Sequence, residues 1–191
     1  KIFMEKIILA SQSPRRKELL SLAEIPFDVI VSETDESFPE GLSFEEAAIH
    51  IAVNKALAVA EKAGNERTIL AADTIVVCNE QLIGKPKDRE DAVRILTMLS
   101  GNTHRVITAV CILTGGEQNV FADPTTVSFH PLTREQIVFY VDKYKPYDKA
   151  GAYAIQEWIG VTGIKKIDGD FYNVMGLPVS RVAAMLSAAS A

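Results

Sequence analysis

An apolar run followed at once by a basic helix start places the strongest constraint on the fold. Residues 7–10 (Ile-Ile-Leu-Ala) have the composition of a buried strand. The segment that follows predicts a helix, with Ser13 in the N-cap position and Pro14 in the first turn. A strand that leads directly into a helix is typical of α/β folds, which bind ligands at such turns.

The charge of this turn is unusual. The first turn of a helix favours acidic residues because the helix dipole is positive there, yet this one carries Arg15, Arg16 and Lys17. With the hydroxyl groups of Ser11 and Ser13 nearby, the turn is suited to a polyanion such as a chain of phosphates. The alternative is a solvated basic turn that binds nothing.

The remaining pattern mixes strands and helices without strict alternation. Strands are expected at 27–31, 68–78, 81–83, 105–113, 120–121, 125–129, 164–167 and 171–174, and helices at 17–23, 43–64, 88–101, 133–144 and from 176 onward. The last two strands flank Asp168-Gly169-Asp170, which predicts a hairpin. A turn is expected at 79–80, and capping boxes are expected from Ser43 with Glu46 and from Thr133 with Gln136. The first helix is expected to bury an apolar face that consists of Leu19, Leu20, Leu22 and Ala23. The expected fold class is therefore α/β, a mixed β-sheet with flanking helices.

Composition limits the possible partners. The chain has 191 residues and a net charge of −5, which argues against broad nucleic-acid binding but not against a local nucleotide pocket. No apolar run reaches membrane-spanning length, so no membrane partner is expected. Cys78 and Cys111 lie in apolar runs and are expected as reduced core residues, which favours a cytoplasmic location.

An acid within the most apolar part of the chain is the second notable feature. Asp73 lies in the run 69–77, where an unpaired carboxylate is costly to bury. That cost favours a general base or a metal ligand, and the alternative is a structural acid that caps a loop. Asp35 and Glu36 could share a divalent cation with Asp73, or they could form a solvated acidic loop.

Three further residues are candidate ligand contacts. Lys85 lies in a turn between a glycine and a proline, and Lys55 lies beside the apolar stripe of its expected helix. An exposed loop lysine and an ordinary surface lysine are the respective alternatives. Gln156 follows a segment of small residues, and its amide offers both the donor and the acceptor needed to read the edge of a base.

Taken together, several of these segments resemble the Maf protein family. The resemblance is carried by residues 11–20 (Ser-Gln-Ser-Pro-Arg-Arg-Lys-Glu-Leu-Leu), 72–74 (Ala-Asp-Thr), 84–86 (Gly-Lys-Pro), 99–101 (Leu-Ser-Gly), 148–153 (Asp-Lys-Ala-Gly-Ala-Tyr), 166–170 (Lys-Ile-Asp-Gly-Asp) and 175–178 (Met-Gly-Leu-Pro). They occur in the family's order and span nearly the whole chain.

The resemblance implies a nucleoside triphosphate pyrophosphatase of the dTTP/UTP branch, which forms the monophosphate and pyrophosphate with a divalent cation, Mg²⁺ or Mn²⁺. It also implies an elongated fold related to inosine triphosphate pyrophosphatases. Residues 1–191 are expected to form one domain with two lobes around a central cleft. A nucleoside triphosphate is the expected ligand, and a homodimer the expected assembly.

The same resemblance assigns roles to individual residues. Asp73 matches the proton acceptor, and Glu36 matches a carboxylate near it, so both are candidate metal ligands. The positions matching base-specificity residues are Arg15, Thr74 and Gln156. The positions matching polar or phosphate-facing residues are Ser11, Arg16, Lys55 and Lys85. Ala154 and Glu157 stand where glycine is common in this branch, which implies a stiffer loop around Gln156.

Two other functions stay open at this point. A regulator of cell division that senses nucleotides without turning them over would keep the binding residues but release no product. A phosphate-monoester hydrolase would release free phosphate instead of pyrophosphate.

Overall fold

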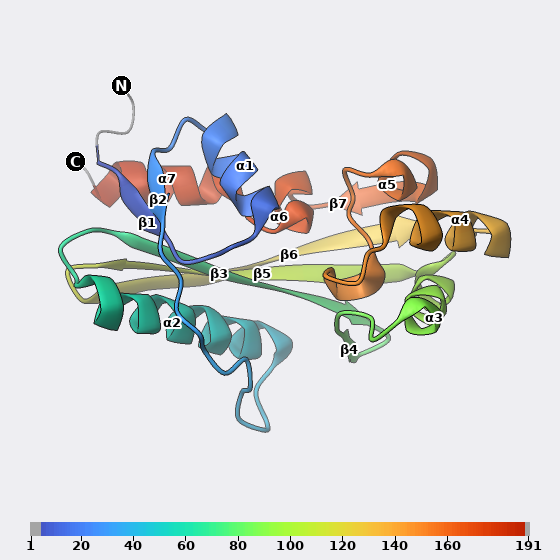
Figure 1. The fold of residues 1–191 in the computed structure, drawn as a ribbon, viewed down its shortest axis with the longest axis horizontal. Helices are drawn as coiled ribbons and strands as arrows, with labels where there is room; N and C mark the ends of the chain where they lie inside the picture. Colours follow the sequence, from blue (N-terminus) through green and yellow to red (C-terminus); the bar gives the residue numbers. More distant parts are fainter. Residues whose placement is uncertain (1–4, 190–191) are drawn as a thin grey trace. The chain divides into compact units, whose positions relative to one another are not determined.

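The computed structural model describes residues 5–189 (Figure 1). The strands are β1 (Ile7–Leu9), β2 (Phe27–Val29), β3 (Ile69–Cys78), β4 (Gln81–Ile83), β5 (Thr103–Thr114), β6 (Glu117–Phe129) and β7 (Ile164–Asp168). The helices are α1 (Pro14–Leu22), α2 (Phe44–Ala63), α3 (Arg89–Leu99), α4 (Arg134–Tyr144), the 3-10 turn η1 (Ala150–Ala152), α5 (Trp158–Gly163), α6 (Phe171–Met175) and α7 (Val179–Ala189).

The strands form one mixed sheet in the order β2-β1-β3-β5-β6-β7, with β4 paired to β3. Strand β1 runs parallel to both β2 and β3, whereas β3–β4 and β6–β7 are antiparallel. The mixed α/β sheet with flanking helices expected from the sequence is therefore confirmed.

The chain divides into two compact units. Unit 1 comprises residues 1–74, 108–123 and 176–191, and unit 2 comprises residues 75–107 and 124–175. Strands β3, β5 and β6 contribute residues to both units. The expectation of one domain with two lobes around a central cleft stays a prediction.

In unit 1, α2 lies on the opposite side of β3 from α1 and α7 (Figure 1). The cap residues explain where its helices begin. The Ser13 hydroxyl accepts from the Arg16 amide at the start of α1, and Ser43 and Glu46 form a reciprocal capping box at the start of α2. Both caps were expected. Leu22, expected on the buried face of α1, is instead 70% exposed because Leu19 and Leu20 face the core.

In unit 2, α3 packs against α4 and η1. Asp88 caps α3, and Thr133 and Gln136 form the expected capping box of α4. The turn between β3 and β4 has positive φ at Asn79 and Glu80, as the sequence predicted for a tight turn there.

The hairpin expected around Asp168-Gly169-Asp170 is wrong. Strand β7 ends at Asp168, and the residues expected as the partner strand form helix α6. The cause is local: the Asp170 carboxylate accepts from the backbone amides of Tyr172 and Asn173, which caps a helix and removes those amides from strand pairing. The short helix α5 was not expected either.

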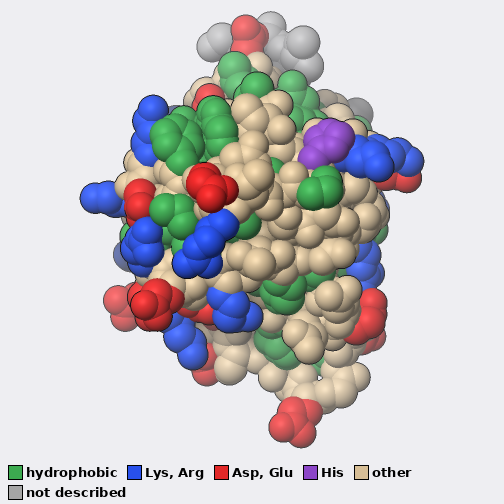
Figure 2. Space-filling view, turned by 90° about the vertical axis from the view of Figure 1, so that its right-hand side faces the viewer, with side chains coloured by type: hydrophobic (Ala, Val, Ile, Leu, Met, Phe, Trp, Pro, Cys, Tyr) green, Lys and Arg blue, Asp and Glu red, His purple; other side chains and the backbone are tan. Residues whose placement is uncertain are grey.

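The surface carries charges of both signs. Figure 2 shows basic and acidic side chains intermixed on one face of the molecule, with apolar side chains exposed among them. Cys78 and Cys111 are buried free thiols, as expected. Within residues 5–189, no helix combines the length and the apolar character needed to cross a bilayer.

Candidate active site

The basic turn at the start of α1 holds a buried arginine that connects four segments of unit 1. Strand β1 ends at Leu9, and the chain turns so that the Arg16 guanidinium enters the interior, where the residue is only 9% exposed. Its Nε donates to the Gly176 carbonyl oxygen at 2.7 Å. Its Nη1 donates to Ser11 Oγ at 3.2 Å, and its Nη2 donates to Thr74 Oγ1 at 2.9 Å.

These contacts decide what Arg16 can still bind. A guanidinium carries five N–H groups, and three are used here, which leaves two for a ligand. Burial lowers the pKa of Arg16 to about 10, while the Asp73 carboxylate acts in the opposite direction and Arg15 adds to the lowering. The group therefore stays charged at neutral pH, and the basic turn offers a fixed positive charge beside Asp73.

Gly176 lies directly against this arginine. Its φ is +124°, a backbone conformation that side chains rarely adopt. A Cβ there would lie 3.7 Å from Arg16 Nε and 3.8 Å from Thr74 Oγ1. The glycine therefore presents its carbonyl oxygen to the guanidinium without a side chain beside it.

A second strand orients the Thr74 hydroxyl. Thr108 on β5 is fully buried, and its Oγ1 lies 2.8 Å from Thr74 Oγ1. Because Thr74 accepts from Arg16, its own proton is directed toward Thr108 or toward the Gly176 carbonyl oxygen 3.5 Å away. The predicted specificity residue Thr74 is thus held in one orientation by unit 1 alone.

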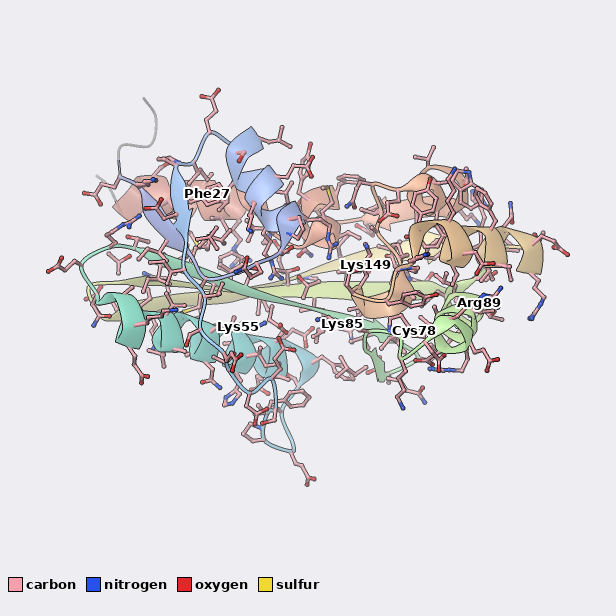
Figure 3. The ribbon with its side chains drawn as sticks, viewed as in Figure 1. Phe27, Lys55, Cys78, Lys85, Arg89 and Lys149 are labelled. Carbon is pink, nitrogen blue, oxygen red and sulfur yellow. The ribbon has the colours of Figure 1, made fainter. Side chains whose placement is uncertain are left out.

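A lysine joins the two carboxylates that the sequence singled out. Lys55 lies on the side of α2 that is turned toward β3 (Figure 3), and its Nζ lies 2.9 Å from Asp73 Oδ1 and 3.0 Å from Glu36 Oε1. The side chains of Lys55 and Asp73 are 19% and 12% exposed, whereas that of Glu36 is 59% exposed. The ion pair of Lys55 with Asp73 is thus partly shielded, and Glu36 reaches it from the loop before α2.

Asp73 keeps one carboxylate oxygen available. Oδ1 accepts from Lys55, while Oδ2 accepts no hydrogen bond from the residues the structure describes. The side chain is 12% exposed, so water or a ligand can donate to this second oxygen. This is the geometry that a proton acceptor requires.

The donor set fits a divalent cation only in part. Among residues 5–189, no three His, Cys, Asp or Glu side chains form a group that could hold a metal ion by themselves. Asp73 and Glu36 nevertheless meet at one ammonium group, and Mg²⁺ commonly takes one or two carboxylates together with substrate phosphates. These residues therefore fit a cation that arrives with a phosphate ligand.

Seven predicted site residues besides Asp73 and Glu36 lie in the described part of the chain. In unit 1, Ser11, Arg16 and Thr74 form one hydrogen-bonded cluster, and Lys55 bonds to Asp73, the residue before Thr74. Arg15 lies beside Arg16 on α1. Lys85 follows β4 and Gln156 precedes α5, and both belong to unit 2. The cluster contains Thr108 and Gly176 as well, which the sequence reading had not singled out as site residues. Thr108 did carry a signal, since it is a polar residue within an apolar strand, as Asp73 is.

The two predicted segments of unit 2 are connected by the backbone. The Gly151 amide donates to the Gly84 carbonyl oxygen at 3.2 Å, which ties the turn before Gln156 to the turn that carries Lys85. Tyr153, three residues before Gln156, forms a hydrogen bond with His104, with 2.6 Å between the phenol oxygen and Nε2.

Comparison with known proteins assigns this fold and cluster to a class. The family described as Maf-like protein matches residues 6–189. A protein of Parabacteroides distasonis named dTTP/UTP pyrophosphatase is 47% identical over 93% of this chain and 92% of its own length. One of Cytophaga hutchinsonii with the same name is 49% identical over 92% of this chain and 80% of its own length. The chain belongs to the Maf-like protein family.

A solved structure supports the fold. The Ham1 protein of Staphylococcus aureus aligns over 97% of this chain and 100% of its own, with a TM-score of 0.52 and 18% sequence identity. At that identity the likeness concerns the fold alone.

Proposed function

We propose that this protein is a nucleoside triphosphate pyrophosphatase that hydrolyses dTTP and UTP to the monophosphate and pyrophosphate. The observation that carries the proposal is the Asp73 carboxylate, which is buried, fixed through Oδ1 by Lys55 and open at Oδ2, one residue from the Arg16–Thr74 contact. The names of relatives such as those of Parabacteroides distasonis and Cytophaga hutchinsonii support it.

The reaction follows from what these groups can do. Asp73 Oδ2 accepts a proton from water, and the water oxygen attacks phosphorus in line as the bridge between the α- and β-phosphates breaks. The leaving oxygen departs with the pyrophosphate. Arg16 and Lys55 supply positive charge where negative charge builds on the phosphate oxygens, in a partly buried site where charges act more strongly than in water.

A divalent cation belongs to the proposal in a limited form. Asp73 and Glu36 are the residues that would hold it, with phosphate oxygens as further ligands. When bound, it neutralises charge on the phosphates. The Lys55 ammonium group contacts the same two carboxylates, so it offsets the electrostatic repulsion between them before substrate binds.

Several finer assignments extend the proposal by resemblance to the family. Arg15, Thr74 and Gln156 select the base, and Ser11 and Lys85 contact polar groups of the substrate. Mg²⁺ or Mn²⁺ is the metal, the assembly is a homodimer, and the protein acts in the cytoplasm.

The test is a substrate panel with product identification. Purified protein is given each pyrimidine and purine triphosphate with Mg²⁺ or Mn²⁺, and products are separated by anion exchange. The proposal expects monophosphate and pyrophosphate in equal amounts, fastest for dTTP and UTP. Tight nucleotide binding without product would favour the sensing function, and release of orthophosphate would favour the monoester hydrolase.

A further inference from the structure

Gln156 lies at the tip of a closed turn in unit 2. The Glu157 amide donates to the Ala154 carbonyl oxygen at 3.1 Å, which closes a four-residue turn over residues 154–157. The residues just before the tip, 151–155, are buried, whereas Gln156 is exposed. Its side-chain amide makes no hydrogen bond to the part of the chain that the structure describes, so both its donor and its acceptor are available.

One buried hydroxyl contacts both ends of this turn. The Ala154 amide donates to Tyr140 Oη at 3.1 Å, and Tyr140 Oη donates to Glu157 Oε2 at 3.4 Å. Tyr140 lies on α4 and is fully buried. Burial raises the pKa of Tyr140, so the phenol keeps its proton and remains a donor to the carboxylate.

The carboxylate at the end of the turn has a cationic partner. Lys149 Nζ lies 3.6 Å from Glu157 Oε1 and 3.0 Å from Asp148 Oδ1. The side chains of Lys149 and Glu157 are 13% and 20% exposed, so the pair is largely shielded from water. Glu157 is therefore fixed from two sides, by the phenol and by the ammonium group.

Packing leaves the turn little room to move. A Cβ at Gly160 would lie only 1.6 Å from the Ile155 carbonyl oxygen, so helix α5 lies directly against the turn. Tyr153 is the residue just before the turn. Its hydroxyl oxygen lies 2.6 Å from His104 Nε2, and its ring packs edge-on against the Phe129 ring. The backbone on both sides of Gln156 is thus anchored to α4, α5 and β5.

We propose that Tyr140 and Glu157 are positioning residues that fix Gln156 for recognition of the base. The inference rests on the proposed function and deepens it, because it explains how an exposed glutamine acquires one orientation. A side chain on a rigid turn loses less freedom on binding than one on a mobile loop, so affinity for the matching base is higher. Neither residue needs to touch the substrate.

The expected effect is specific to the base. Loss of one hydrogen bond at the turn should raise the KM for UTP and dTTP by about fivefold, the scale of one net hydrogen bond. The kcat should change by less than about twofold, since the residues act on binding. Inorganic tripolyphosphate, which has no base, should inhibit with an unchanged Ki.

The experiment compares four variants. Tyr140→Phe and Glu157→Ala remove the two contacts of the turn, and Glu157→Gln keeps an acceptor for the phenol. Tyr144→Phe is the matched control, because it removes a hydroxyl from the ring that stacks on Tyr140 at 5.0 Å without touching the turn. For each, KM and kcat with UTP and the Ki of tripolyphosphate are measured, and folding is checked by urea unfolding.

The inference expects a raised KM in Tyr140→Phe and Glu157→Ala, and near wild-type values in Glu157→Gln and Tyr144→Phe. An unchanged KM in both disruptive variants, or a Ki for tripolyphosphate that rises in parallel with the KM, would overturn it. If Tyr140→Phe does not fold, the two Glu157 variants decide. If wild-type protein releases no pyrophosphate, the proposed function fails, and the positioning role is then decided from the dissociation constants of UTP and tripolyphosphate by calorimetry.

Discussion

Lys55 on α2 and Asp73 on β3 form a partly shielded ion pair, with 2.9 Å between Nζ and Oδ1. The same ammonium group lies 3.0 Å from Glu36 Oε1. The contact fixes the orientation of the Asp73 carboxylate and directs its second oxygen away from the lysine. A helix, a strand and a loop are thereby joined at one ammonium group of unit 1.

Replacing Asp73 with asparagine should remove turnover while leaving the fold intact. The amide is nearly the same size and still accepts from Lys55, but it cannot take a proton from water. We expect kcat to fall by roughly two to four decades, the usual scale for loss of a general base. Steady-state pyrophosphate release measures it. Glu61→Gln, on an exposed position of α2, is the control and should keep full activity; an active Asp73→Asn would remove Asp73 from its role.

Replacing Lys55 with methionine should change how the protein binds divalent cations. Without the ammonium group, the carboxylates of Asp73 and Glu36 would lose the cation that they share, and a divalent cation could take its place before substrate binds. We expect Mn²⁺ or Mg²⁺ to raise the melting temperature of Lys55→Met by several degrees more than that of wild type. Lys62→Met removes an equal charge from the same helix and should behave as wild type. Equal shifts in both variants would argue against Asp73 and Glu36 as cation ligands.

Replacing Arg16 with lysine should destabilise unit 1 although the positive charge is retained. A lysine cannot donate at once to Ser11, Thr74 and the Gly176 carbonyl oxygen, so buried acceptors lose their partners. We expect a loss of about 2 to 4 kcal/mol in the free energy of unfolding, measured with urea. Arg94→Lys, at a position with a 65% exposed side chain, should change stability by less than about 0.5 kcal/mol. Equal losses in the two variants would contradict the account of Arg16.

His104 should make stability depend on pH in a defined window. Burial lowers the pKa of His104 to about 4, well below its usual 6.5. Between these values the unfolded chain binds a proton that the folded protein does not, so stability rises with pH and is lost as pH falls from 6.5 toward 4. From pH 7.5 to pH 5 this loss amounts to about 2 kcal/mol.

The measurement is urea unfolding of wild type and His104→Asn at both pH values. The variant should be less stable at pH 7.5, because it loses the contact with Tyr153, but it should lose about 2 kcal/mol less than wild type on acidification. The difference between the two proteins removes the contribution of carboxylates, which is common to both. Identical pH dependence would show that His104 is not buried in its neutral form.

The sequence predicted helix starts correctly where the capping residues are close together in the chain. Ser13 with Pro14, Ser43 with Glu46 and Thr133 with Gln136 each predicted a helix start that the structure confirms. It failed at Asp170, because the same residues, Asp and Gly, can close a hairpin or cap a helix, and only the neighbouring amides decide. It also failed at Leu22, since the direction of the core depends on the sheet beneath α1.

The candidate site was predictable as residue types but not as a network. An acid in an apolar strand pointed to Asp73, and the charge of the first turn pointed to Arg16. Nothing in the sequence indicated that the Gly176 carbonyl oxygen would accept from Arg16, because the two positions are 160 residues apart. Tyr140 was likewise unmarked, since its hydroxyl matters only through contacts with the turn at Gln156.

The most direct test of the central claim is the identity of the products formed from UTP by wild-type protein and by Asp73→Asn, measured side by side. We predict UMP and pyrophosphate in equal amounts from the wild type and, at equal folding stability, a rate lower by roughly two to four decades from the variant. Formation of UDP and orthophosphate, or the same rate from both proteins, would contradict the account.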